Sequence, residues 1–186
     1  MDLRIKPGDF LIADPSILGD THFHRSVILI CAVQDESPMG FIVNKPFHFS
    51  LTEVLPEIDK DLPLFYGGPV DVDQLFFIYR ANDMIFEGSK AISDQLFFGG
   101  DVDAALHAIE TGQLNKRNSR FFLGYSGWSK GQLEEEINME SWAVQSSSSS
   151  SSFLAANTKD LWRNALINMG GDYRIWADTP ENPNYN

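Results

Sequence analysis

Short apolar runs, many of them rich in β-branched and aromatic residues, recur along the chain and are bounded by turn-forming residues. Runs of about four to eight such residues predict buried β-strands. Seven runs of this kind are Phe10–Ala13, Ser26–Val33, Gly40–Asn44, Leu62–Tyr66, Leu75–Tyr79, Met84–Phe86 and Phe121–Tyr125. Much of the chain is therefore expected to form β-sheet.

Helices are predicted where a capping residue precedes apolar positions spaced three and four residues apart. The predicted caps are Ser50, Asp101, Ser129 and either Asn157 or Thr158. Pro56 keeps the first helix short, whereas Gly112 and Gly170 are placed to end the second and the last. Three or four helices among irregularly alternating strands and hairpins favour an α+β fold with a mixed sheet.

The length and composition of the chain favour one domain, residues 1–186, with a core built without metals or disulfides, because 43% of the residues are apolar. The single cysteine, Cys31, lies within an apolar run and is predicted to be a core residue and not a nucleophile. No apolar run has the length of a signal peptide core or of a membrane span, about 20 residues, so a cytoplasmic location without a membrane partner is expected.

The net charge of the chain bears on whether it can bind nucleic acids. The chain has 26 acidic and 14 basic residues, a formal net charge of -12, which repels phosphate backbones. Direct nucleic-acid binding is therefore not expected unless basic residues cluster in space. Lys116–Arg120 is the densest basic segment, Lys45 could join it in the fold, and Lys159 and Arg163 form a basic pair at helical spacing.

Two segments have similar sequences, Leu64–Asp71 and Leu96–Asp103. A strand pattern follows the first and a helix pattern follows the second, so two separate turns after aromatic strands are predicted, and not a repeat architecture. Ser146–Ser152 is a run of serines typical of a flexible linker, and no functional inference is drawn from it.

Six motifs occur in a fixed order along the chain: Gly8–Ala13, Phe23–Val27, Gly40–Pro46, Tyr66–Val70, Phe98–Asp101 and Leu123–Trp128. In this order they resemble the bacterial YqgE/AlgH family. Met169–Tyr173, Trp176–Ala177 and Pro180–Pro183 resemble the variant of that family found in Bacteroidetes-like bacteria. The resemblance implies a mixed, partly closed sheet with flanking helices. It implies no activity, because most members are uncharacterised and some are described as transcriptional regulators.

Gly124–Trp128 comes close to the Gly-x-Ser-x-Gly turn that presents a nucleophilic serine, but Trp128 replaces the final glycine. No histidine follows His107, so a serine, acid and histidine in hydrolase order cannot be completed after Ser126. A turn between a strand and a helix is the favoured interpretation of this segment.

Asp20, His22 and His24 alternate, and in an extended segment their side chains would share one face as metal ligands. A surface loop that carries two histidines is far commoner, so no metal is expected. No cofactor is expected either. The pairs Gly67-Gly68 and Gly99-Gly100 could cradle a phosphate, but neither fits a known phosphate-binding pattern.

Polar and amphipathic residues within the family motifs are the remaining candidates for a site: Arg25, Asn44, Tyr125, Ser126 and Trp128. Brought together by the sheet, they could line a cleft for a small molecule or a peptide. The competing interpretation, in which Asn44 forms a turn and Trp128 fills the core, carries somewhat more weight.

The sequence offers no complete set of nucleophile, base and stabilising donors, which favours a non-enzymatic binding or regulatory protein that acts through a small-molecule or protein partner. The alternative is an enzyme of unknown reaction whose site is assembled from Arg25, Asn44, His22, His24 or Ser126, which lie far apart in sequence.

Overall fold

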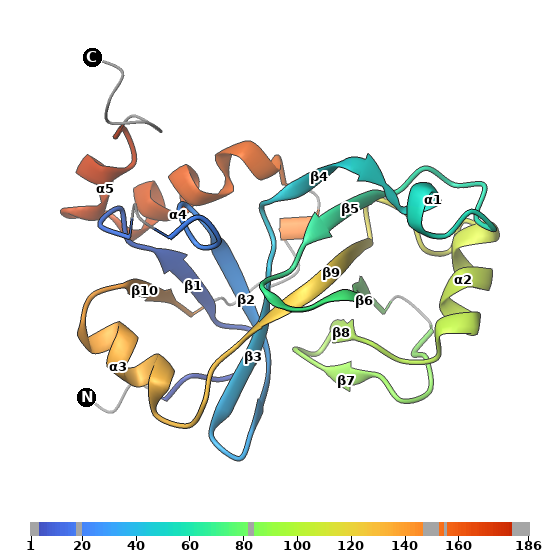
Figure 1. Ribbon diagram of the computed structural model, residues 1–186, viewed down its shortest axis with the longest axis horizontal. Helices are drawn as coiled ribbons and strands as arrows, with labels where there is room; N and C mark the ends of the chain where they lie inside the picture. The colour runs from blue at the N-terminus through green and yellow to red at the C-terminus, as the bar shows by residue number, and fades with distance from the viewer. Residues whose placement is uncertain (1–3, 18–19, 82–83, 147–152, 155, 180–186) are drawn as a thin grey trace.

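The computed structural model describes residues 4–17, 20–81, 84–146, 153–154 and 156–179. Residues 147–152 of the serine run and the Pro180–Pro183 motif lie outside the described residues. Within the described residues the fold is α+β, with a mixed sheet flanked by helices (Figure 1).

The sheet comprises ten strands among the described residues: β1 (Phe10–Ala13), β2 (Val27–Gln34), β3 (Ser37–Ile42), β4 (Pro46–Ser50), β5 (Pro63–Tyr66), β6 (Val70–Arg80), β7 (Lys90–Ala91), β8 (Leu96–Phe98), β9 (Ser119–Gly127) and β10 (Trp142–Gln145). Their order is β10-β1-β2-β3-β9-β6-β8-β7, with β5 also beside β9 and β4 beside β5. The pair of β5 and β9 is parallel, and the other pairs are antiparallel.

The long strand β9 joins two halves of this sheet (Figure 1). Its end pairs with β3 through Gly127 and Ser126, whereas the rest of the strand pairs with β5 and β6. Gly124 lies between these regions with a φ of 70°, and a Cβ there would lie 2.5 Å from the carbonyl oxygen of Gly68. Only glycine fits this close approach, which lets the strand change direction between the two halves.

The largest core cluster lies between the two halves, with residues such as Leu29, Phe41, Ile78 and Phe122. A second cluster covers the outer face of the half formed by β5, β6 and β9. A third covers the outer face of β1, β2 and β3. The apolar side chains therefore form three layers, one between the two halves of the sheet and one on the outer face of each half.

The five α-helices of the described residues are α1 (Leu51–Val54), α2 (Val102–Glu110), α3 (Gln132–Asn138), α4 (Leu161–Met169) and α5 (Tyr173–Trp176), and a short 3-10 helix, η2 (Thr158–Asp160), precedes α4. Two predicted caps are confirmed, because Asp101 accepts a hydrogen bond from the Ala104 N–H at 2.7 Å, and Asn157, before η2, accepts one from the Lys159 N–H. The predicted cap Ser129 is wrong, because α3 begins after Gly131. Residues of α1 and α2 belong to the second core cluster, and Leu133 of α3 belongs to the third.

The expectation of a partly closed sheet is wrong. The strand path is open, and no pairing within the described residues links β10 to β7. Trp162, Ala165 and Leu166 of α4 instead pack into the central cluster together with Phe153 and Leu154. The α4 helix and the 153–154 segment therefore contribute side chains to the interior between the two halves of the sheet.

Two further expectations also need correction. Five α-helices replace the expected three or four, because α5 is a single turn of four residues without a periodic apolar pattern. Met84–Phe86, expected as a strand, is a loop whose Phe86 side chain is buried in the second cluster, while the Phe86 N–H donates to the Tyr79 hydroxyl at 3.0 Å. The part of the chain that the structure describes holds no helix long and apolar enough to cross a membrane.

Candidate functional site

Arg25 and Asn44, two of the five residues selected from the sequence, lie together at the start of β2. Arg25 has a φ of 52°, an uncommon conformation for a residue with a side chain. The Asn44 side chain holds this turn, because its Oδ1 accepts from the Val27 N–H at 2.8 Å and its Nδ2 donates to the Arg25 carbonyl at 2.9 Å. Asn44 therefore forms a turn, as the competing interpretation of the sequence expected.

The guanidinium of Arg25 is fixed against the C-terminal helices. It lies 4.7 Å from the centroid of the Trp162 ring and donates to the carbonyl oxygen of Thr179. The indole of Trp162 is itself anchored, because its N–H donates to the Ala13 carbonyl at 2.8 Å. A cation stacked on a buried, hydrogen-bonded indole is held in place before any ligand arrives.

We call the hollow beside this residue the Arg25 cleft. It has a volume of about 700 Å³ and is lined by Thr21, His24, Arg25, Asn44, Lys45, Thr158, Lys159, Trp162, Arg163 and Ala177. The Nζ of Lys45 donates to the His22 carbonyl at 2.6 Å. Partial burial lowers the pKa of Lys45, an effect that the Asp20 charge opposes.

A second hollow, the Arg120 cleft, has a volume of about 730 Å³. Arg120 is only 5% exposed and donates to three carbonyl oxygens, those of Val43 at 2.6 Å, Phe153 at 2.9 Å and Leu154 at 3.3 Å. Its guanidinium also lies 4.5 Å from the Phe65 ring centroid. Burial lowers the pKa of Arg120 to about 10, so the group still carries its charge at neutral pH.

The two clefts concentrate the positive charge of an acidic chain. They meet at Thr158, which lines both. Eight of the 14 lysines and arginines line them: Arg25, Lys45, Lys159 and Arg163 in the Arg25 cleft, and Arg80, Lys116, Arg117 and Arg120 in the Arg120 cleft. Among the described residues, no aspartate or glutamate lines either cleft, although Asp178 pairs with Arg163 at 2.6 Å on the exposed rim.

Tyr125, Ser126 and Trp128 lie away from both clefts. Ser126 is 0% exposed, and its hydroxyl donates to the Gly67 carbonyl at 3.1 Å. Tyr125 and Trp128 line a third hollow of about 530 Å³ near the end of β9, and the indole N–H of the buried Trp128 donates to Glu136. The structure therefore separates the five selected residues into a pair, Arg25 with Asn44, and a group on β9.

Asp20 and His22 lie in a turn and not in the extended segment that a shared ligand face requires. The Oδ1 of Asp20 accepts from the His22 N–H at 2.8 Å and from the Phe23 N–H at 3.1 Å. The Nδ1 of His22 is 2.6 Å from the Tyr66 hydroxyl. Among the described residues, no group of three histidine, cysteine or acidic side chains lies close enough to hold a metal ion.

The glycine pair Gly67-Gly68 allows two segments of the chain to pack closely. A Cβ on Gly67 would lie 2.1 Å from the Gly124 carbonyl oxygen, and one on Gly68 would lie 2.3 Å from the Tyr125 backbone. Both glycines therefore allow the turn before β6 to lie directly against β9, with no space for a phosphate between them.

Comparison with known proteins agrees with this fold. The model of a family described as AlgH-like matches residues 10–174. The chain belongs to the AlgH-like family. A relative from Cytophaga hutchinsonii, named UPF0301 protein, is 41% identical over 180 residues, covering 96% of this chain and 98% of the relative. One from Chlorobium limicola with the same name is 39% identical, covering 98% and 97%.

Two solved structures share the architecture. A crystal structure of a Corynebacterium diphtheriae protein has a TM-score of 0.76 at 22% identity, covering 95% of this chain and 93% of the other, which concerns the fold alone. The solution structure of the AlgH protein from Pseudomonas aeruginosa has a TM-score of 0.68 at 25% identity, covering 94% of each chain.

Sequence reasoning missed several residues of the clefts in this AlgH-like chain. Neither Trp162 nor Arg80 is among the residues selected from the sequence. Lys159 and Arg163 gave a usable signal, a basic pair four residues apart at the start of a helix. Their proximity to Arg25 depends on the docking of α4, which no local pattern encodes.

Proposed function

We propose that this AlgH-like protein is a non-enzymatic binding protein with a regulatory role exercised through a partner, and that its two basic clefts hold an anionic small molecule. The observation that supports the proposal most strongly is the charge of the clefts, which gather eight of the 14 basic residues and, in the part of the chain that the structure describes, no acidic residue. In a chain with a net charge of -12, such a local surplus of cations favours the binding of an anion in the clefts.

The chemistry of the clefts suits phosphate or carboxylate groups. Guanidinium groups present several N–H donors in a plane and match such oxygens in pairs, whereas lysine supplies a mobile point charge. Arg25 is already oriented by its contact with Trp162, so little ordering remains to oppose binding. The volumes of about 700 and 730 Å³ are typical of small-molecule sites, which are on the order of 300–1,000 Å³.

Arg120 adds a second reason to expect an anion. Its charge is desolvated, and its guanidinium donates to carbonyl oxygens, those of Val43, Phe153 and Leu154. A ligand anion in the Arg120 cleft would favour the charged guanidinium and would raise its depressed pKa. The most costly buried charge of the cleft would then contribute to affinity.

The enzyme alternative receives partial support, because His24, Arg25 and Asn44 do line one cleft. We nevertheless prefer binding. Both polar groups of the Asn44 side chain are used by the backbone, and Ser126 is buried elsewhere. The clefts thus offer many hydrogen-bond donors. The contacts described for Arg25, Asn44 and Ser126 do not pair a nucleophile with a base.

We also propose that duplex DNA is not the ligand. Acidic residues dominate the chain outside the clefts, and the long-range repulsion they exert is much greater for a polymer of phosphates than for a small anion with few charges. Fluorescence anisotropy with duplex DNA across a salt series tests this point. Sub-micromolar binding at physiological salt that is lost in Arg117→Ala would contradict it.

The binding proposal is tested by NMR of the four tryptophan indole N–H groups in ¹⁵N-labelled protein. Titration with inorganic pyrophosphate should shift the Trp162 signal, identified through Trp162→Phe, until it saturates. The Trp128 and Trp142 signals are internal controls, because both indoles donate to Glu136 beneath α3 and should not move. A Trp162 signal that stays fixed, or that moves in step with the controls, would overturn the proposal.

Phosphorus NMR of the same samples separates binding from catalysis. Pyrophosphate that stays intact over a day with saturating protein supports the binding protein. The enzyme alternative would be favoured if the unmodified protein converts pyrophosphate to orthophosphate and the double variant Lys159→Gln with Arg163→Gln does not.

A further inference from the structure

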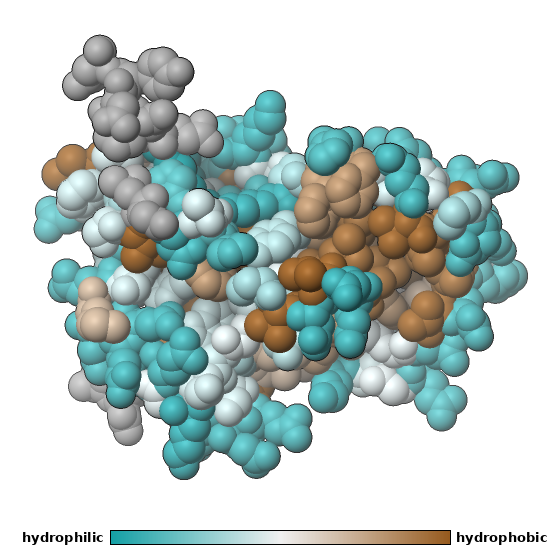
Figure 2. Space-filling model, viewed as in Figure 1, coloured by the Kyte–Doolittle hydropathy of each residue, from teal (hydrophilic) through white to brown (hydrophobic). Residues whose placement is uncertain are grey.

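The half of the molecule that carries β4, β5, β6, α1 and α2 has a large apolar surface (Figure 2). Apolar side chains on this surface pack against the second core cluster but are only partly buried. We define the apolar patch as Phe47, Phe49, Leu55, Leu75, Leu106 and Leu123. Single exposed apolar residues are ordinary on a protein surface, whereas a contiguous group of this kind marks an interaction site.

The patch is continuous across three strands. Leu75 of β6 is opposite Leu123 of β9, and Leu123 is opposite Tyr66 of β5 in the parallel register. The Phe47 ring lies 6.1 Å from the Tyr66 ring and 4.7 Å from the Phe49 ring, measured between centroids. Strand pairing and ring stacking therefore present these side chains as one surface.

The patch is exposed to solvent because α1 and α2 cover only part of this face of the sheet. Buried α2 residues such as Ala105 and Ile109 cover the strand region around Phe77 and Phe121. On the other side, α1 is a single turn that ends at Val54, which is 36% exposed. Leu75 and Leu123, two residues further along these strands, are only partly buried by the described residues.

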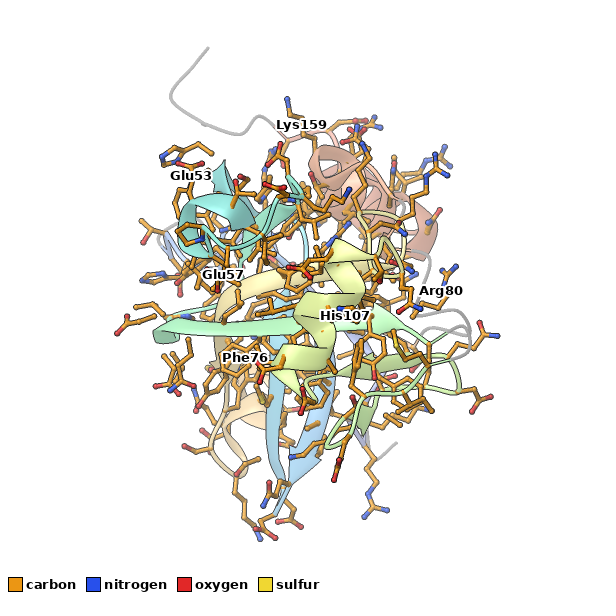
Figure 3. All side chains as sticks on the ribbon, turned by 90° about the vertical axis from the view of Figure 1, so that its right-hand side faces the viewer. Glu53, Glu57, Phe76, Arg80, His107 and Lys159 are labelled. Carbon is orange, nitrogen blue, oxygen red and sulfur yellow. The ribbon has the colours of Figure 1, made fainter. Side chains whose placement is uncertain are left out.

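Acidic residues predominate in several segments next to the patch. Three of the segments that form it or flank it, 46–61, 70–75 and 101–110, contain nine acidic residues and one lysine, Lys60, whereas Lys116 and Arg117, which follow α2, line the Arg120 cleft. The acidic residues are Glu53, Glu57, Asp59, Asp61, Asp71, Asp73, Asp101, Asp103 and Glu110. Figure 3 shows Glu53 and Glu57 beside α1 on the same side of the molecule, while α2 with His107 faces the viewer. We call these acidic residues the acidic rim of the patch. Its charge is opposite in sign to that of the two clefts.

We infer that the apolar patch is the docking surface for a basic amphipathic helix of a partner protein. Such a helix would continue the layer begun by α1 and α2, with its apolar face on Leu75 and Leu123 and its lysines or arginines against the acidic rim. Charge complementarity decides the choice of occupant, because a neutral or acidic helix would leave the rim carboxylates uncompensated. A second copy of the chain is disfavoured, since its basic residues lie mainly in clefts and not beside a matching apolar face.

The test uses a fluorescein-labelled synthetic helix of about 18 residues in which leucine and lysine alternate with helical periodicity. Fluorescence anisotropy at physiological salt should show a Kd of about 10 μM or tighter. The variant Glu57→Lys with Asp73→Lys should bind at least about tenfold more weakly, because it reverses two charges on the rim. Val54→Asn should also weaken binding, since it places a polar group beside the apolar patch.

Two controls make the result decisive. Glu134→Lys with Glu135→Lys reverses two exposed charges on α3, on the opposite outer face, and should change the Kd by less than about twofold. A peptide with glutamate in place of lysine should not bind. Equal weakening by both charge-reversal variants, equal binding of the glutamate peptide, or dimerisation of the unliganded chain that Val54→Asn abolishes would overturn the inference.

Discussion

Replacing Asn44 by alanine should destabilise the protein strongly, because Asn44 is the residue that fixes the turn of Arg25. The substitution removes an acceptor from the Val27 N–H, at 2.8 Å, and a donor from the Arg25 carbonyl, at 2.9 Å. Val27 is only 3% exposed, so its N–H has little access to replacement water. An unsatisfied buried amide costs about 1–3 kcal/mol, and a typical hydrogen bond contributes about 1 kcal/mol.

Together these terms predict that Asn44→Ala lowers the free energy of unfolding by about 2–4 kcal/mol. Urea unfolding followed by far-UV circular dichroism measures the change, with the slope of the transition as a check that the unfolded state is unaffected. Asn164→Ala is the matched control, because Asn164 is exposed on α4 and its loss should change stability by less than about 0.5 kcal/mol. An effect of Asn44→Ala as small as that of the control would refute the positioning role assigned to this side chain.

Three further predictions concern residues outside the clefts. Cys31 is 1% exposed and burial raises the pKa of its thiol, so iodoacetamide should alkylate it only after unfolding, as intact mass spectrometry would reveal. Gly67→Ala places a Cβ 2.1 Å from the Gly124 carbonyl and should lower the urea midpoint far more than Gly127→Ala, where the closest atom is in a tyrosine ring at 3.0 Å. Glu136→Ala removes the acceptor of two indole N–H groups and should cost about 2 kcal/mol in the same assay, whereas Glu136→Gln keeps an acceptor oxygen and should cost less.

Each of these predictions has a clear contrary result. Stoichiometric alkylation of Cys31 in the native protein would show that β2 opens readily. Equal urea midpoints for the two glycine variants would show that the turn before β6 can move away from β9. An unchanged stability for Glu136→Ala would mean that the indoles find other acceptors.

The strands with long apolar runs could be predicted from the sequence, and the short or irregular ones could not. Phe10–Ala13 has the predicted bounds, and Phe121–Tyr125 lies within β9. Strands β4 and β10 lack such a run: β4 begins at Pro46 and β10 has four residues, so tertiary pairing with β5 and β1 defines them. Ser50, Asp101 and Asn157 were predicted correctly as caps, because a cap is a local interaction between side chain and backbone, whereas Ser129 was predicted wrongly, since α3 begins after Gly131.

The candidate site could be predicted only in part, for the same reason. Arg25 and Asn44 belong to family motifs, and the pairing of β2 with β3 brings them together. Lys159 and Arg163 reach them only through α4, which docks on the central core far along the chain. Ser126 and Trp128 share the motif character of Arg25 but face the interior, because strand alternation and Gly124 set their directions. Which motif residues face a ligand is thus a property of the assembled sheet.

Isothermal titration of inorganic pyrophosphate into charge-matched variants tests the central claim, anion binding in the two clefts, most directly. Lys159→Gln with Arg163→Gln removes two cations that line the Arg25 cleft, and Lys6→Gln with Lys60→Gln removes two exposed cations that line neither cleft. The account predicts saturable binding at physiological salt that weakens at least about tenfold in the first variant and less than about twofold in the second. Equal weakening in both variants, or no saturable heat with the unmodified protein, would contradict it.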